Sequence, residues 1–118
     1  MMNILEEMSS VSGCKGAMLV GRDGLVILQN MATGTDAKAL GALAATMYRD
    51  IEKALSEAQL GKPGITIVEA AEGQVFLVDI GEGILVVVAE SGVNTGMIRL
   101  RLRDGARQLK EVVARDVG

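Results

Sequence analysis

The chain has no histidine and no tryptophan, and its 118 residues include only one cysteine, one tyrosine and one phenylalanine. Histidine is the usual general acid–base at neutral pH and a frequent metal ligand. Its absence excludes histidine-dependent hydrolase triads, histidine-ligated zinc sites and histidine phosphotransfer. The single thiol, Cys14, has no second cysteine to pair with and no histidine to activate it as a nucleophile.

Phosphate-binding motifs are missing as well. The sequence contains neither a G-x-x-x-x-G-K-[ST] loop nor a G-x-G-x-x-G turn. Together with the missing histidine, this predicts a protein that is not an enzyme and that carries no cofactor and no metal. We expect a domain that works by binding.

Signals for export or membrane insertion are also lacking. The longest uncharged apolar run, residues 84–89, is far too short to span a bilayer. The first residues include Glu6 and Glu7 and have no basic stretch, so they do not resemble a secretory signal, and there is no N-x-[ST] sequon. A lone thiol in such a chain predicts a cytoplasmic protein that does not insert into membranes.

The charge is small but unevenly distributed. The net charge of −3 divides into +3 for residues 94–118 and −6 for residues 1–93. This asymmetry is too mild, and the chain too poor in aromatic residues, to indicate a nucleic-acid partner. Apolar residues make up 49 % of the chain, which is typical of one globular domain over residues 1–118 with an aliphatic core.

The pattern of apolar residues predicts eight elements in the order α-ββ-α-βββ-α, an α+β fold. Its first hairpin turns at Asp23-Gly24, a strong hairpin signal. Residues 84–88 are continuously apolar, as in a central strand, whereas residues 65–69 alternate, as in an edge strand. The expected helices cover residues 2–9, 36–60 and 94–115, and the expected strands cover residues 17–20, 25–28, 65–68, 75–78 and 84–88.

Helix ends are also predicted. Thr35 or Asp36 can cap the start of the middle helix, and Gly61 is expected as the left-handed residue after its end. Asn94 is expected to cap the last helix, whose buried stripe is predicted to be Ile98, Leu102, Ala106, Leu109 and Val113.

The middle helix is apolar over more than half of its circumference. One stripe is large (Leu40, Leu43, Met47, Ile51, Leu55, Ala58) and a second is small (Ala37, Gly41, Ala44, Ala45, Tyr48). A helix that lies on a single sheet needs only one apolar face. A helix with two apolar faces therefore needs a second packing partner to bury the other face. We interpret the small stripe as a dimer or partner surface. The alternative is that another element of the same chain buries it.

Three segments of the chain carry a family pattern: residues 16–27 (GAMLVGRDGLVI), residues 40–47 (LGALAATM) and residues 92–99 (GVNTGMIR). They resemble, in that order, the first hairpin, the alanine-rich helix and the turn into the last helix of the roadblock family. This is the dynein light-chain type of domain, related to longin and profilin folds. None of these segments is a catalytic signature, so the resemblance speaks more strongly for fold than for function.

The resemblance implies a five-stranded antiparallel sheet flanked by helices. It also implies dimers in which the middle helix and the third strand pair with their counterparts across a two-fold axis. In prokaryotes, freestanding members of the family accompany Ras-like GTPases as regulators, and one group activates GTP hydrolysis without supplying a catalytic arginine. The expected partners are therefore a second copy of the chain and a Ras-like small GTPase.

Two alternatives remain beside such a regulator: a structural adaptor dimer in a motor, kinase or membrane complex, and a small-molecule sensor. The predicted site residues fall into two groups. The dimer interface is assigned to Leu40, Gly41, Ala44, Ala45, Tyr48, Ile65 and Ile67. Partner binding is assigned to Met47, Arg49, Asp50 and Lys53. Arg99, Arg103, Arg107 and Lys110 form a line on the last helix, which we interpret as a solvated face supported by i, i+4 pairs.

Overall fold

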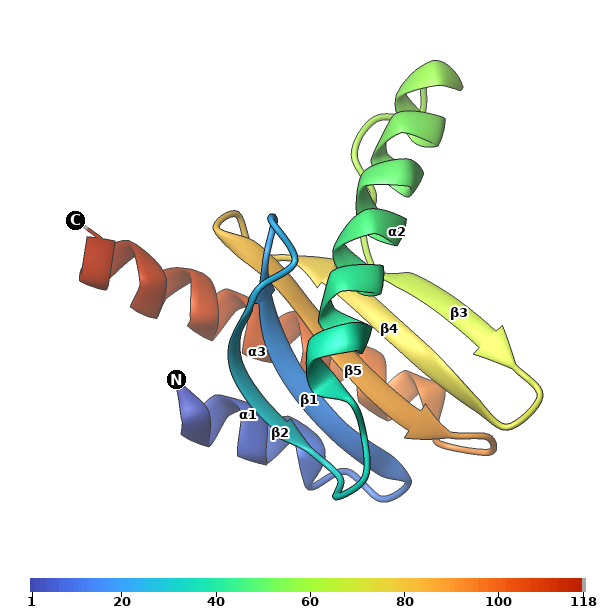
Figure 1. The fold of residues 1–118 in the computed structure, drawn as a ribbon, viewed down its shortest axis with the longest axis vertical. Coiled ribbons are helices and arrows are strands. Elements are labelled where there is room, and N and C mark those ends of the chain that lie inside the picture. Colours follow the sequence, from blue (N-terminus) through green and yellow to red (C-terminus); the bar gives the residue numbers. More distant parts are fainter. Residues whose placement is uncertain (118) are drawn as a thin grey trace.

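A computed structural model describes residues 1–117, with side chains through Arg115. The predicted order α-ββ-α-βββ-α is confirmed (Figure 1). The elements are α1 (Met2–Ser9), β1 (Cys14–Gly21), β2 (Val26–Met31), α2 (Ala37–Glu57), β3 (Thr66–Ala70), β4 (Gly73–Asp79), β5 (Gly83–Glu90) and α3 (Thr95–Val117). No helix within this described part of the chain is long and apolar enough to cross a bilayer.

The five strands form one antiparallel sheet in the order β2-β1-β5-β4-β3. The predicted central strand is indeed the middle one, and four consecutive residues of β5, Ile84 to Val87, are buried. β3 lies at an edge of the sheet, as its alternating sequence predicted, and β2 forms the other edge. Helix α2 lies in front of the sheet in Figure 1, and α1 and α3 lie behind it.

The two faces of the sheet have separate cores. Alternate residues of each strand point to opposite faces, so neighbours such as Met18 and Leu19 belong to different clusters. The core beneath α1 and α3 is the larger one and includes Leu5, Leu19, Phe76, Leu85, Ile98, Leu102 and Leu109. The core beneath α2 consists of Met18, Val20, Ala44, Ala45, Tyr48, Leu77, Ile84 and Val86.

Helix α2 begins as predicted but ends earlier. Asp36 caps its start, because its Oδ1 accepts a hydrogen bond of 3.0 Å from the amide of Ala39. Gly61 was predicted as the left-handed residue after the helix. It does have a positive φ of 85°, but Gln59 takes the left-handed conformation first, with φ 60°. The amide of Leu60 donates to the carbonyl of Leu55 at 2.9 Å, which completes a Schellman motif two residues before the expected position.

Helix α3 confirms its predicted cap and buried stripe. The Oδ1 atom of Asn94 accepts a hydrogen bond of 3.1 Å from the amide of Met97. Gly105, an unfavourable residue in a helix, has a packing reason: a Cβ there would lie 2.8 Å from Sδ of Met8. The glycine lets α1 and α3 approach closely. The buried face of α3 consists of Ile98, Leu102, Ala106 and Leu109.

Candidate functional site

The small-residue stripe of α2 faces the sheet of its own chain. Ala44, Ala45 and Tyr48 are 0 to 1 % exposed and contact the core beneath the helix. Gly41 is also buried. The prediction that this stripe is the exposed dimer surface is therefore wrong for these four residues, and the alternative of burial within the chain holds.

The reason for this orientation is the close approach of α2 to the first hairpin. A Cβ at Gly41 would lie 3.0 Å from Cγ2 of Val26 and 3.4 Å from the carbonyl oxygen of Gly24. On the hairpin side, a Cβ at Gly24 would lie 3.2 Å from Cα of Ala42. Small residues on the inner face therefore allow helix and hairpin to pack against each other, and this directs the large stripe outward.

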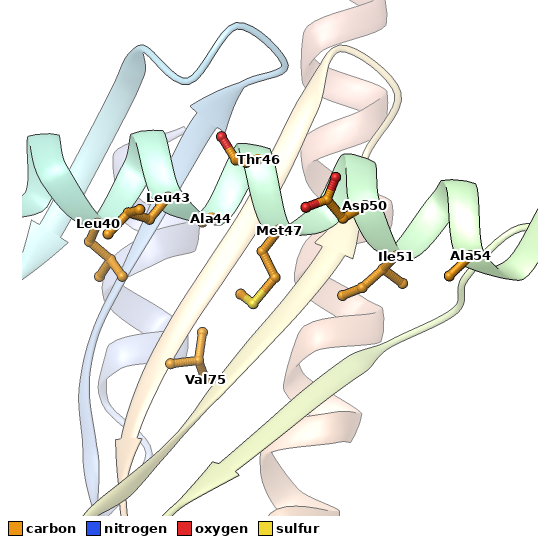
Figure 2. A pocket seen from close by; sticks show the side chains of 9 residues that line it. All are labelled: Leu40, Leu43, Ala44, Thr46, Met47, Asp50, Ile51, Ala54 and Val75. Carbon is orange, nitrogen blue, oxygen red and sulfur yellow. The ribbon is translucent and has the colours of Figure 1, made fainter.

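The outward stripe lines an open apolar groove, shown in Figure 2. In that view Met47 is directed toward Val75 on β4, whereas Thr46 points away from it. Leu43 is 68 % exposed, an unusual position for a leucine in the middle of a long helix. The groove has a volume of about 520 Å³ and is lined by Leu40, Leu43, Ala44, Thr46, Met47, Asp50, Ile51, Ala54 and Val75.

The edge strand β3 extends this apolar face. Val68 pairs with Val75 and is exposed, so it continues the surface beyond the groove. Ile67 pairs with Phe76 instead, and both Ile65 and Ile67 pack against the core on the opposite face of the sheet. The side chains of these two isoleucines are therefore not available on the α2 side, where they were predicted to contribute.

The residues predicted for the dimer interface overlap only in part with this open apolar surface. Of the predicted interface residues, Leu40 and Ala44 line the groove, although Ala44 is itself fully buried. The residues that sequence reasoning missed are Leu43, Ile51, Ala54, Val68 and Val75. Alternation along β3 was the available signal for Val68, because it places Val68 and Ile67 on opposite faces.

The predicted partner-binding residues have different surroundings. Met47 and Asp50 line the groove, and Lys53 is exposed. Arg49 is engaged within the chain, where it donates to the carbonyl of Arg22 at 3.1 Å and to Oγ1 of Thr46 at 3.4 Å. The groove therefore has an apolar floor and a charged margin.

One end of α2 is held by a polar cluster around Arg22, which sequence reasoning missed. Its Nη2 lies 2.5 Å from Oδ2 of Asp79, and its Nη1 lies 3.3 Å from Oε1 of Glu52. Its Nε donates to the carbonyl of Gly81 at 3.1 Å. Arg22 thus joins the β1–β2 turn, helix α2 and the β4–β5 turn, and it fixes the position of the helix that carries the groove.

Tyr48 is buried beside this cluster. Burial, followed by the negative charges of Asp79 and Glu52, raises the pKa of Tyr48 to about 12. Its hydroxyl has no hydrogen-bond partner among the described protein groups. A buried phenol near two carboxylates resists ionisation because the phenolate would lose hydration and be repelled by like charges.

Comparison with known proteins places the chain in a family. Residues 2–89 match the family model of the Roadblock/LC7 domain. The uncharacterized proteins MJ1340 and MJ0310 of Methanocaldococcus jannaschii are each 37 % identical to the chain over 107 residues, which cover 91 % of this chain and 94 % of each relative.

Solved structures show the same fold at low sequence identity. Myxococcus xanthus MglB has a TM-score of 0.89 at 17 % identity, with 96 % of this chain and 94 % of that chain covered. A Roadblock/LC7 domain from Streptomyces avermitilis also has a TM-score of 0.89, at 18 % identity, with coverages of 97 and 98 %. The family model and the 37 % identical relatives together establish that the chain belongs to the Roadblock/LC7 family.

Proposed function

We propose that the protein is a dimer that binds and regulates a Ras-like small GTPase and catalyses no reaction of its own. The observation that carries this proposal is the apolar groove between the outer face of α2 and Val75. Leu43 in this groove is 68 % exposed although the inner face of the helix is fully packed. An apolar hollow with a charged margin has the composition of a specific protein interface.

A second copy of the chain fits this groove. Pairing of β3 with the β3 of another copy would satisfy the free edge of the sheet, and a two-fold axis perpendicular to the sheet would bring the two α2 helices together on one face. Val68 and Val75 would then continue the apolar contact from helix to strand. A solved MglB of the same fold, with a TM-score of 0.88 and 18 % identity, is described as having a tetrameric arrangement.

The GTPase assignment rests on family membership and on the margin of the paired helices. Freestanding prokaryotic members of this family act beside Ras-like GTPases, and two α2 helices in a dimer would present Asp50 and Lys53 on both sides of an apolar centre. A cytoplasmic location agrees with the single free thiol. Burial raises the pKa of Cys14, which keeps the thiol protonated and supports a role without covalent catalysis.

Titration calorimetry tests this proposal. The titrant is a Ras-like small GTPase from the same organism, loaded with GDP or with a GTP analogue. We expect saturable binding in at least one nucleotide state, and we expect Lys53→Glu to weaken it without changing the dimer mass. Arg103→Glu, an exposed charge reversal on α3 across the sheet, is the matched control and should have little effect. Absence of binding in both states would contradict the regulator proposal and favour the structural adaptor.

A further inference from the structure

The first two turns of α3 carry a surface that the proposed dimer and GTPase sites do not use. It consists of Met97, Arg99, Leu100, Arg101 and Arg103, which we name the basic–apolar patch. All five residues are exposed. Their outward direction follows from the helix itself, because Ile98 and Leu102 point into the core, and Leu100 lies two residues from each, on the opposite side.

The arginines of the patch lack the salt bridges that the next arginine along the helix forms. Arg107 forms salt bridges with Asp104 and Glu111, so its charge is largely balanced within α3. For Arg99, Arg101 and Arg103, no salt bridge and no side-chain hydrogen bond exists among the described side chains. The i, i+4 pairing expected for a solvated helix face therefore holds at Arg107 but fails in the first two turns.

The apolar members are exposed beyond what the packing of α3 requires. Leu100 is 63 % exposed and Met97 is 41 % exposed. On the helix surface these two residues are three apart and therefore adjacent. Leu100 has an arginine on either side in sequence, at positions 99 and 101. A small apolar ridge bordered by long cationic side chains is typical of helices that lie in the interface of a membrane.

We infer that the basic–apolar patch docks the protein onto the surface of an anionic lipid bilayer. The arginines would bind lipid phosphates and headgroup carboxylates, while Leu100 and Met97 would enter the boundary between headgroups and acyl chains. The patch is the convex outer face of a helix, which can lie along the flat, deformable surface of a bilayer. No segment needs to span the bilayer.

The charge distribution and the fold favour this orientation. Residues 94–118, which contain α3, carry a net +3, whereas residues 1–93 carry a net −6, so an anionic surface attracts α3 itself. Helix α1, on the same face of the sheet, carries the exposed carboxylates of Glu6 and Glu7, so the attraction is local to α3. Figure 1 shows α3 and α2 on opposite faces of the sheet. A bilayer on the α3 side therefore leaves the groove on α2 free for a protein partner.

Co-sedimentation with vesicles tests the inference directly. The probes are phosphatidylcholine vesicles with 30 mol % phosphatidylserine and vesicles of phosphatidylcholine alone, at about 0.1 M salt, where the Debye length is about 10 Å. We expect binding to the anionic vesicles only, and we expect 0.5 M salt to release the protein. A wild-type protein that binds neither vesicle, or both equally, would overturn the inference.

Three variants separate the contribution of the arginines from that of the apolar residues. Arg101→Gln with Arg103→Gln should weaken vesicle binding about 25-fold, since each basic residue near an anionic surface contributes about fivefold. Leu100→Ser should also weaken binding although it leaves every charge in place. Lys38→Glu, an exposed charge reversal on α2, is the control and should retain wild-type binding.

Two further results would contradict a membrane role. If Leu100→Ser bound anionic vesicles as tightly as the wild-type protein, the apolar residues would not contribute, and binding would be nonspecific charge attraction. Binding to soluble polyglutamate with none to anionic vesicles would assign the arginines to an acidic protein. Circular dichroism of each variant separates loss of binding from loss of folding.

Discussion

Gly41 of α2 lies directly against Val26 of β2, and a methyl group built on the glycine would come within 3.0 Å of Cγ2 of the valine. This contact sets how closely the helix approaches the first hairpin and therefore which face of α2 points outward. Gly41→Leu should destabilise the fold by about 1–3 kcal/mol, the usual cost of overpacking. Urea denaturation measures the change. Ala39→Leu, at an exposed position of the same helix, should have an effect within about 0.5 kcal/mol of zero.

A double-mutant cycle tests whether Val26 is the group that Gly41 accommodates. Val26→Ala removes the Cγ2 atom nearest to the added side chain. Combined with Gly41→Leu, it should restore part of the lost stability, so that the two changes cost less together than their separate effects predict. Strict additivity would show that the glycine is needed for another reason.

Tyr48 is the only tyrosine, and the chain has no tryptophan, so tyrosinate absorbance near 295 nm reports on this residue alone. The pKa of Tyr48 is raised to about 12, from an ordinary value of 10.0, by burial and by the nearby carboxylates of Asp79 and Glu52. We expect a midpoint near 12 in the native protein, whereas in denaturant it should fall to about 10. A native midpoint near 10 would contradict the buried environment of the ring.

The same shift predicts how stability depends on pH. The folded protein holds the phenolic proton more tightly than the unfolded chain, so ionisation favours unfolding above the unfolded pKa. The stabilisation is complete below about pH 10 and is lost progressively between about pH 10 and 12, for a total of about 2–3 kcal/mol. Tyr48→Phe should remove this part of the pH dependence, which chemical denaturation at pH 9 and pH 11.5 would measure.

The cluster around Arg22 should contribute modestly to stability. Its guanidinium, 2.5 Å from Asp79, has a side chain that is 40 % exposed, so water screens the pair. A double-mutant cycle of Arg22→Gln and Asp79→Asn should give a coupling of about 0.5–1 kcal/mol that decreases with salt. A coupling indistinguishable from zero at low salt would mean that the Arg22–Asp79 pair does not stabilise the link between the β1–β2 turn and β4.

The sequence predicted the order of elements, the central and edge strands and two helix caps, because these depend on local patterns. Asp36 and Asn94 are examples, since a side chain that accepts a hydrogen bond from an amide three residues later is a local event. The end of α2 was placed late because Gln59, two residues before Gly61, already takes the left-handed conformation. Residue preference favours glycine at such positions but does not require it.

The faces of α2 could not be assigned from periodicity. Both stripes are apolar, and the choice between them depends on the distance between Gly41 and a hairpin that precedes it in sequence. For the same reason the cluster around Arg22 was missed, because its partners Glu52 and Asp79 follow it by 30 and 57 residues. Pattern analysis locates apolar surface well, but tertiary contacts decide which surface is left free.

We expect a second copy of the chain to cover the outer face of α2. Multi-angle light scattering of the wild-type protein and two leucine variants measures whether it does. Leu43→Arg changes a groove residue that is 68 % exposed, and Leu60→Arg, at 71 % exposed, is the matched control beyond the helix. We predict twice the chain mass of 12.3 kDa for the wild type and Leu60→Arg, and 12.3 kDa for a fully helical Leu43→Arg. A wild-type mass of 12.3 kDa at every concentration, or a Leu43→Arg variant that remains dimeric, would contradict the account.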